Sequence, residues 1–377
     1  MQDGQPGSVR LLKIIFLTSC LEPGRDGVGD YTRRLAAECV RQGCPSAIMA
    51  LNDPYINREI SEIQTIEDVS ISVLRFPVTL SWAIRVRSAR KWLEEFNPHW
   101  VSLQFVPFGF HPKGLSLGLA RHLKSIIGSY PLHWMFHELW VLWSFPLSLR
   151  KRLLGQVQKL GLRSCLEKLK PKAVATHLPI YKEELKKLGW KVKLLPLHGN
   201  IPIYPSFEAN QWLEGRSGLP TKGQDIKGGF FGNILPTLNP SMVADWISKV
   251  KMPGRNLVIL SAGKIGGESE CLWNSLIREF ANNATFLRLG ELDERDSSFY
   301  FSTLDYGLTA YPPELMGKSG SVAAMREHGL PVVPFGSLAS GSGSPTREFS
   351  VCVTAAQPWT VRNSAEAFLQ QLETERA

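Results

Sequence analysis

Several features that would place this 377-residue chain in a narrow class are missing from its sequence. No run of about 18 apolar residues occurs, so we expect no membrane-spanning helix. The apolar stretch at residues 11–17 reads as a buried strand and not as a signal peptide. The six cysteines, at positions 20, 39, 44, 165, 271 and 352, form no close C-x-x-C pair, which indicates neither a zinc cage nor a disulfide framework. A reducing cytoplasm is therefore the expected compartment.

Common catalytic motifs are missing as well. Gly317-Lys318-Ser319 has the end of a P-loop, but Pro312 stands where the first glycine is required, which excludes a Walker A motif. The turn that begins Gly27-Val28-Gly29 has Thr32 in place of the third glycine of a dinucleotide fingerprint, which argues against a nicotinamide cofactor. No G-x-S-x-G elbow and no helix-spaced histidine pair occurs.

Positive charge is present and is concentrated locally. Lys plus Arg number 43 against 34 Asp plus Glu, and between Leu147 and Lys172 eight basic residues accompany one acid, Glu167. A second predicted helix, Trp82–Trp92, mixes tryptophan with basic residues. Such stretches suit anionic lipid or polyphosphate, although a solvated helix face is the commoner explanation. No nucleic-acid-binding signature is present, so we expect no nucleic-acid partner. The basic stretches lead us to expect a peripheral contact with the inner face of an anionic membrane.

Strand and helix patterns alternate along the whole chain, which predicts the α/β class with doubly wound parallel sheets. In the first part, helices are expected at Asp30–Gln42 and after each later strand, with strands at residues 11–19, 46–51, 71–76, 100–106, 133–139, 173–176 and 192–197. In the second part, strands are expected at residues 229–234, 257–260, 285–289, 305–311, 330–335 and 351–353. The predicted organisation is two Rossmann-like domains facing a cleft, with ligands at the carboxyl ends of the strands.

The domain boundaries follow from composition. Residues 1–200 form the first domain, and residues 201–224, which are rich in proline, glycine and polar side chains, form a hinge. Residues 225–362 form the second domain. Residues 363–377, including a helix over Ser364–Glu375, are expected to pack back on the first domain.

The most informative segment is Gly317–Ser321, which leads into a short apolar helix ending at Gly329. The start of a helix offers backbone N–H groups and the positive end of the peptide dipole. Small residues let an anion approach closely, and Lys318 adds a full positive charge. This pattern predicts a phosphate site, with an ordinary capped βαβ turn as the alternative.

A charged pair, His137-Glu138, ends an apolar strand. There the imidazole could donate to a sugar hydroxyl or a phosphate oxygen, and the carboxylate could orient it. A structural histidine is an equally good interpretation of these two residues. His111 and His177 also follow strand ends, but the spacing of the three histidines does not favour zinc.

Five short motifs, in this order, resemble those of a retaining glycosyltransferase of the GT-B fold, similar to family 4. The glycine turn at Gly27 is similar to the N-terminal glycine loop of that family, and His137 to its mid-domain histidine. The other three motifs are Asn200 in His198–Pro202, the turn Phe230–Ile234, and the nucleotide-sugar segment Tyr311–Val333. The family pattern has two glutamates that this sequence does not match. Ala323 stands at the position of the ribose-binding glutamate. Leu315 stands at the position of the second glutamate, and Glu314 lies one residue before it.

The resemblance implies an enzyme of polysaccharide biosynthesis that moves a sugar, glucose foremost, from a UDP donor to a glycan or lipid-linked acceptor, without a metal or other cofactor. It implies catalytic roles for His137, Glu138 and Glu314, donor diphosphate contacts for Gly232, Asn233, Lys264, Lys318, Ser319, Gly320 and Ser321, and acceptor-side or sugar-side roles for Gly27, Val28, Gly29, Asp30, His111 and Asn200. A nucleotide-sugar epimerase and a catalytically silent sugar-nucleotide-binding protein remain alternatives.

Overall fold

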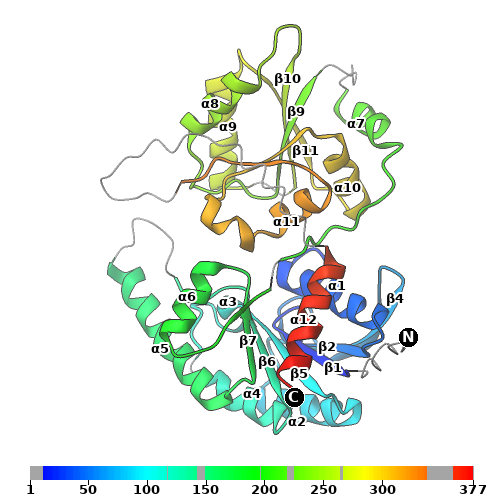
Figure 1. Ribbon diagram of the computed structural model, residues 1–377, viewed down its shortest axis with the longest axis vertical. Coiled ribbons are helices and arrows are strands. Elements are labelled where there is room, and N and C mark those ends of the chain that lie inside the picture. Colours follow the sequence, from blue (N-terminus) through cyan, green and yellow to red (C-terminus); the bar gives the residue numbers. More distant parts are fainter. Residues whose placement is uncertain are drawn as a thin grey trace, which may run out of the picture. The chain divides into compact units, whose positions relative to one another are not determined.

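The chain forms two compact units in the computed structural model: unit 1 is Met1–Leu195 with Val361–Ala377, and unit 2 is Pro196–Thr360. The residues described are 12–116, 118–141, 149–195, 197–218, 225–263, 266–337 and 360–376. Figure 1 shows a central sheet with flanking helices in each unit. Within the described residues, no helix is long and apolar enough to cross a membrane.

Unit 1 is built on an eight-stranded sheet in the order β3-β4-β2-β1-β5-β6-β7-β8. All neighbouring strands are parallel except the β3–β4 pair. The strands are β1 (Ile14–Thr18), β2 (Ser46–Asp53), β3 (Ile60–Ile66), β4 (Val69–Pro77), β5 (Trp100–Phe105), β6 (Leu132–Phe136), β7 (Ala173–Thr176) and β8 (Lys193–Leu194). The strand order reverses between β1 and β5, which in such sheets opens a ligand crevice at the carboxyl ends of those strands.

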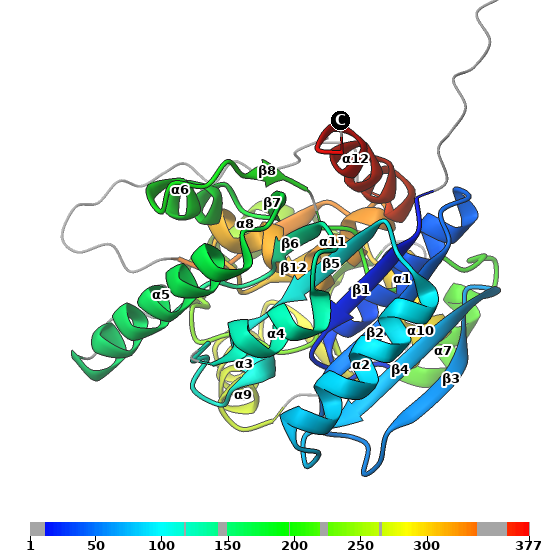
Figure 2. The ribbon, with the colours of Figure 1, turned by 90° about the horizontal axis from the view of Figure 1, so that it is seen from below.

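The helices of unit 1 are α1 (Gly27–Arg41), α2 (Trp82–Phe96), α3 (Pro107–Phe110), α4 (Leu119–Ile127), α5 (Leu149–Leu169), α6 (Pro179–Lys187) and α12 (Val361–Thr374). Helices α2, α4 and α5 pack in succession, while α1 packs against α12 (Figure 2). Right-handed crossovers place these two groups on opposite faces of the sheet, because the chain turns back across β1 after β4. Phe368 of α12 contacts the ring of Phe16 in β1, so the C-terminal helix belongs to the core of unit 1.

Unit 2 contains a five-stranded, fully parallel sheet in the order β11-β10-β9-β12-β13. Its strands are β9 (Ile226–Phe231), β10 (Leu257–Ala262), β11 (Thr285–Gly290), β12 (Tyr306–Thr309) and β13 (Val332–Pro334). Its helices are α7 (Ala209–Ser217), α8 (Pro240–Val250), α9 (Glu268–Phe280), α10 (Glu294–Thr303), the 3₁₀ helix η1 (Pro313–Lys318) and α11 (Gly320–Glu327). The order reverses between β9 and β12, which predicts a ligand site beyond the carboxyl ends of those two strands.

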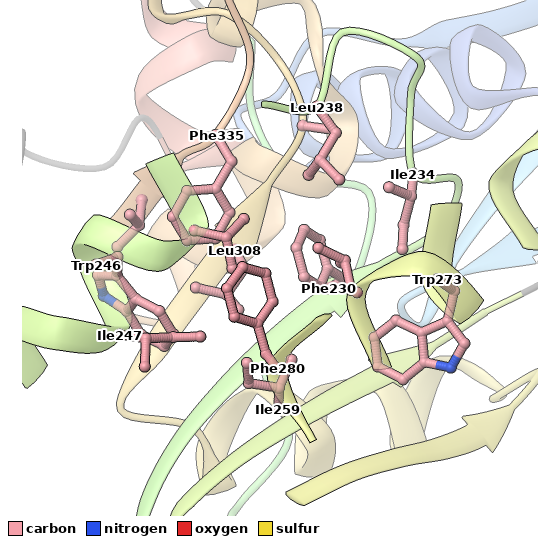
Figure 3. Packing of buried hydrophobic residues seen from close by; sticks show 14 of the residues in the cluster. Phe230, Ile234, Leu238, Trp246, Ile247, Ile259, Trp273, Phe280, Leu308 and Phe335 are labelled. Carbon is pink, nitrogen blue, oxygen red and sulfur yellow. The ribbon is translucent and has the colours of Figure 1, made fainter. Parts of the chain in front are cut away.

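One core of unit 2 fills the space between the sheet and α8 and α9. Figure 3 shows Phe230 of β9 among Trp246 of α8, Trp273 of α9 and Phe335. These rings meet edge-on or tilted, at centroid distances of 5.7 to 6.5 Å, the arrangement that aromatic quadrupoles favour. The core therefore fixes β9 and the turn that follows it.

The doubly wound α/β class predicted from the sequence is confirmed, and the structure differs from the expectations in detail. Strand β3 was not predicted, and α1 begins three residues earlier than expected. The expected hinge at 201–224 contains α7, whose Leu213 is buried in a second core cluster of unit 2. The strand expected at residues 351–353 lies outside the described residues.

Candidate functional site

The carboxyl ends of β9 and β10 in unit 2 are formed by two glycines in close contact. Gly232 and Gly263 have φ angles of +81° and +97°, which side-chain-bearing residues rarely adopt. A Cβ built on Gly263 would lie 3.0 Å from the backbone nitrogen of Gly232. Both positions therefore require glycine, and the two turns bring bare backbone to the point where the strand order reverses. The sequence predicts Gly232 as a site residue and misses Gly263.

The start of α11 lies against the same turns. Ser319 is buried and caps the helix, because its hydroxyl accepts a hydrogen bond of 3.3 Å from the Val322 N–H group. A Cβ built on Gly232 would lie 3.5 Å from the hydroxyl oxygen of Ser321. Lys318, half-buried, ends η1 directly before the cap. The structure thus brings together five of the predicted diphosphate residues: Gly232, Lys318, Ser319, Gly320 and Ser321.

Asn200 joins this group in unit 2. A Cβ built on Gly320 would lie 3.5 Å from the side-chain oxygen of Asn200, an atom that is buried without a hydrogen-bond partner in the described structure. The neighbouring Gly199 donates its N–H to Glu327 of α11 at 3.1 Å. Gly199 also packs closely on Ala324, since a Cβ built on Gly199 would lie 2.7 Å from the Cα of Ala324. Asn200 was expected to have an acceptor-side or sugar-side role, and its contacts place it in unit 2, beside the start of α11.

The remaining residues expected to contact the donor are less well supported. Asn233 and Glu314 are exposed, the first after β9 and the second on η1. Lys264 lies outside the described residues. Ala323, at the position of the missing family glutamate, is half-buried on α11. The geometry therefore supports a backbone-built site more strongly than a side-chain-built one.

In unit 1, the segment expected to be a glycine loop is the first turn of α1. Asp26 caps this helix, and its side chain accepts hydrogen bonds from the N–H groups of Val28 and Gly29 at 2.9 and 3.2 Å. A Cβ built on Gly29 would lie 2.7 Å from the carbonyl oxygen of Cys20, whereas Gly27 has open space around it. The expectation that these N–H groups approach a ligand is therefore corrected: two of them are used by the cap, and Gly29 is required by packing.

Two further residues expected on the acceptor side hold local turns. Asp30 accepts hydrogen bonds from the N–H of Gly24 at 3.1 and 3.2 Å and forms an ion pair with Arg33 at 3.4 Å. His111 Nδ1 accepts from the N–H of Lys113 at 3.1 Å. These contacts organise the segments after β1 and β5 and assign neither side chain to a ligand.

His137 follows β6 and lies in a buried hydrogen-bond chain. Its Nδ1 is 3.0 Å from His177 Nε2, and its Nε2 is 2.9 Å from Gln104 Oε1. His177 Nδ1 in turn donates to the carbonyl oxygen of Leu195 at 2.7 Å. Burial lowers the pKa of His177 to about 4, so this ring is neutral at pH 7. With His177 neutral and donating from Nδ1, its Nε2 is the acceptor in the hydrogen bond with His137 Nδ1.

The edge of Tyr31 covers this histidine pair, with ring centroids 4.8 Å from His137 and 5.4 Å from His177. Both ring nitrogens of His137 are engaged within the protein and the residue is buried, so the expected direct hydrogen bond from His137 to a sugar is not available in this arrangement. The contacts of His137 are therefore those of a buried hydrogen-bond chain within unit 1. Gln104 and His177 lie at the ends of other strands, far from His137 in the sequence. No local sequence motif could therefore predict this chain of hydrogen bonds.

Acidic groups lie close to the start of α1. Burial raises the pKa of Asp26, and the nearby Asp53 and Glu138 carboxylates raise it further, against the lowering effect of the two backbone hydrogen bonds. Asp53 is buried and accepts from Arg75 Nε at 2.9 Å, while Arg75 also bonds Glu22 at 2.6 Å. Within the described residues, no three His, Cys, Asp or Glu side chains are grouped as a metal site.

No protein-family model matches the chain, and a search of curated proteins by sequence finds no match. Solved structures are similar. Anabaena Alr3699/HepE in complex with UDP and glucose has a TM-score of 0.55 at 15% identity, covering 97% of each chain. The catalytic domain of starch synthase IV from Arabidopsis thaliana, bound to ADP and acarbose, has a TM-score of 0.54 at 12% identity, covering 97% of this chain and 92% of that one.

A third similar structure is the α,α-trehalose-phosphate synthase (UDP-forming) from Burkholderia xenovorans in complex with glucose-6-phosphate, with a TM-score of 0.50 at 10% identity over 97% of this chain and 94% of that one. These likenesses extend over nearly the full length of each chain. At such low identity they establish the fold. The chain therefore has the GT-B fold of glycosyltransferases, as its sequence predicts.

Proposed function

We propose that the protein is a retaining glycosyltransferase that transfers glucose from UDP-glucose to a glycan or lipid-linked acceptor in polysaccharide biosynthesis. The observation that carries the proposal is the junction of the Gly232 and Gly263 turns, the capped start of α11 and the Asn200 side chain. The solved relatives support the ligand class, since Anabaena HepE is described in complex with UDP and with UDP-glucose and the Arabidopsis synthase with ADP.

The chemistry at this junction suits a diphosphate leaving group. The first N–H groups of α11 have no partner within the helix and carry the positive end of its dipole. Lys318 adds a full charge beside them, and the two glycines let phosphate oxygens approach the backbone. Negative charge grows on the diphosphate as the bond to the sugar breaks, so these groups stabilise the transition state more than the ground state.

We propose that this positive charge removes the need for a metal ion. Lys318 and the helix start would neutralise the diphosphate, and no cofactor takes part. Glu314, exposed on η1 before Lys318, would hold sugar hydroxyls. Asn200, with its buried carbonyl oxygen beside Gly320, would bind a donor group on the nucleotide sugar.

On the acceptor side, we propose different roles for the neighbouring residues Glu138 and His137 of unit 1. The half-buried Glu138 would contact the acceptor, and His137 would hold the end of β6 through its bonds to His177 and Gln104. We place the enzyme in the cytoplasm, in peripheral contact with an anionic membrane that presents the acceptor.

A specific observation favours a second candidate. Ala323 provides no carboxylate for the ribose, which fits a protein that binds sugar nucleotides without turning them over. The same fold could also host an epimerase, which would convert the sugar nucleotide when no acceptor is present.

The test combines binding and turnover. We expect UDP to bind with an affinity measurable by calorimetry, and UDP-glucose to release UDP when a membrane or glycan extract is added. The anomeric configuration of the product, read by NMR, should match that of the donor. Binding without UDP release across many acceptors would establish the silent-protein alternative, and no binding of any nucleoside diphosphate would overturn the assignment of the site.

A further inference from the structure

Helix α5 in unit 1 carries an exposed apolar stripe. Leu149, Leu153 and Leu160 are 82%, 69% and 65% exposed, and Val157, which lies between them, is 36% exposed. At 3.6 residues per turn these four positions fall within about 80° around the helix axis. The side of α5 that packs on unit 1 is the opposite one, and its buried residues are Gly155, Gln158, Gly161, Leu162, Cys165 and Leu166.

Basic side chains border the stripe on both sides. Arg152 and Arg163 lie along one border, and Arg150 and Lys168 along the other, by the same helical spacing, whereas Lys159 pairs with Glu184 at 3.4 Å and lies over the Trp140 ring within unit 1. Glu167 is the only acid of the helix, and Arg163 pairs with it at 2.9 Å. Glu167 falls at the same angle around the helix as Leu149, so the apolar middle of the outward face runs from Leu149 to Leu160 and becomes polar beyond it, with basic side chains at both borders.

This pattern is not the scatter of apolar side chains found on any protein surface. Single exposed leucines are common, but four aligned on one helix form a continuous patch, which marks an interaction surface. The other helix with this composition, α2, differs, because Trp82 stacks on His122 at 4.7 Å and Trp92 on Phe96 at 6.4 Å. Trp82 of α2 thus packs on α4, and Trp92 stacks along its own helix.

We propose that the outward face of α5 docks on an anionic lipid bilayer, with Leu149, Leu153 and Leu160 inserted below the headgroups and the bordering arginines and lysines paired with lipid phosphates. An amphipathic helix with leucines between basic borders has the chemistry of an interfacial anchor. The cationic borders argue against a second copy of the chain as the occupant, since two such faces would repel each other. The proposal deepens the proposed function by naming the surface that meets a lipid-linked acceptor.

Co-sedimentation with vesicles tests the proposal without any sugar nucleotide, so its failure is separate from failure of the enzymatic assignment. We expect pelleting with vesicles of phosphatidylglycerol and phosphatidylcholine and none with phosphatidylcholine alone. Leu153→Ser with Leu160→Ser should lower the partition coefficient by roughly 100-fold or more, the loss of two inserted leucines. Arg150→Gln with Arg152→Gln should lower it about 30-fold, and high salt should act in the same direction.

Matched variants separate these effects from general changes in the surface. Ile203→Ser with Phe207→Ser removes two apolar side chains of unit 2 that are 59% and 84% exposed, and should leave pelleting unchanged. Arg87→Gln with Lys91→Gln removes two exposed charges of α2 and should have less than half the effect, on a logarithmic scale, of the α5 charge variant.

Three results would overturn the proposal. The first is wild-type pelleting by the Leu153→Ser, Leu160→Ser variant. The second is equal pelleting with neutral and anionic vesicles, or none with either at low salt. The third is a concentration-dependent dimer in light scattering that the same leucine variant abolishes, which would assign the α5 stripe to a second copy of the chain.

Discussion

The two units carry their candidate residues at the same edge of the same kind of sheet, but they present them in opposite ways. In unit 1, the polar groups beyond β6 are bonded to one another: His137 to His177 and Gln104. In unit 2, the N–H groups of Gly232 and Gly263 also donate within the protein, to the carbonyl oxygens of Ala262 and Gly290, and the contrast with unit 1 lies in the bare backbone of these turns and in the start of α11 at Gly320 and Ser321. Under the proposed function, a ligand of unit 2 would meet the start of α11, whereas the histidines of unit 1 are bonded to other groups of the protein.

The largest effect expected from this difference is a pH dependence of unit 1. The pKa of His177 is about 4 in the folded protein against 6.5 for the free side chain, so the unfolded chain binds the extra proton first. His177 therefore contributes stability that is fully present above pH 6.5 and is lost as the pH falls toward 4, by about 3 kcal/mol over that window. His133, with a pKa of about 3, acts in the same sense, and the raised pKa of Asp26 acts in the opposite one.

Urea unfolding between pH 7.5 and pH 4.5 measures this dependence. His177→Gln keeps an amide that can donate to the Leu195 carbonyl but removes the titration, so the variant should have a flatter slope than the wild type. An unchanged slope would mean that the histidine pair is not buried as the structure has it.

A pair of glycine variants sharpens the contrast within α1. Gly29→Ala should destabilise the protein by about 2 kcal/mol, because its Cβ would lie 2.7 Å from the Cys20 carbonyl oxygen. Gly27→Ala, two residues earlier with open space around it, should change the free energy of unfolding by less than about 0.5 kcal/mol. Denaturant titration of both gives the comparison. A Gly27→Ala variant that folds normally but loses turnover would restore a ligand role to this turn.

In unit 2, Lys318→Ala should weaken UDP binding about 10-fold to 100-fold, the usual contribution of a hydrogen bond to a charged group. The melting temperature without ligand should stay within a few degrees of the wild type, because Lys318 is only half-buried. Lys251→Ala, an exposed lysine after α8, is the control and should leave affinity unchanged. Calorimetry measures both, and equal affinities for the two variants would remove Lys318 from the site.

The smallest expected effect is that of a chelator. If the helix start and Lys318 neutralise the diphosphate, an excess of EDTA should leave turnover within about twofold of the untreated enzyme. Abolished turnover that manganese or magnesium restores would contradict the metal-free proposal.

The sequence predicted the sheets well because their inner strands are continuous apolar runs. Strand β3 was missed because Ser61, Glu62 and Gln64 make it read as polar; it is an antiparallel edge strand with one solvated face. The start of α1 was placed at Asp30 because glycines suggest a loop, whereas the Asp26 cap carries the helix back to Gly27.

The sequence predicted the part of the candidate site that lies within one continuous segment of the chain. The capped turn Lys318–Ser321 is local in sequence and could be read directly. The contacts of Asn200 with Gly320, of Gly263 with Gly232, and of His137 with its two partners join distant segments, so only the fold reveals them.

The central claim, that a nucleoside diphosphate binds where α11 begins, is tested most directly by hydrogen exchange with and without UDP. We predict that UDP slows exchange at residues 231–233 and 319–322, while the amides around His137 and His177 keep their rates. Slower exchange confined to unit 1, or no change anywhere at a saturating concentration of UDP, would contradict the claim.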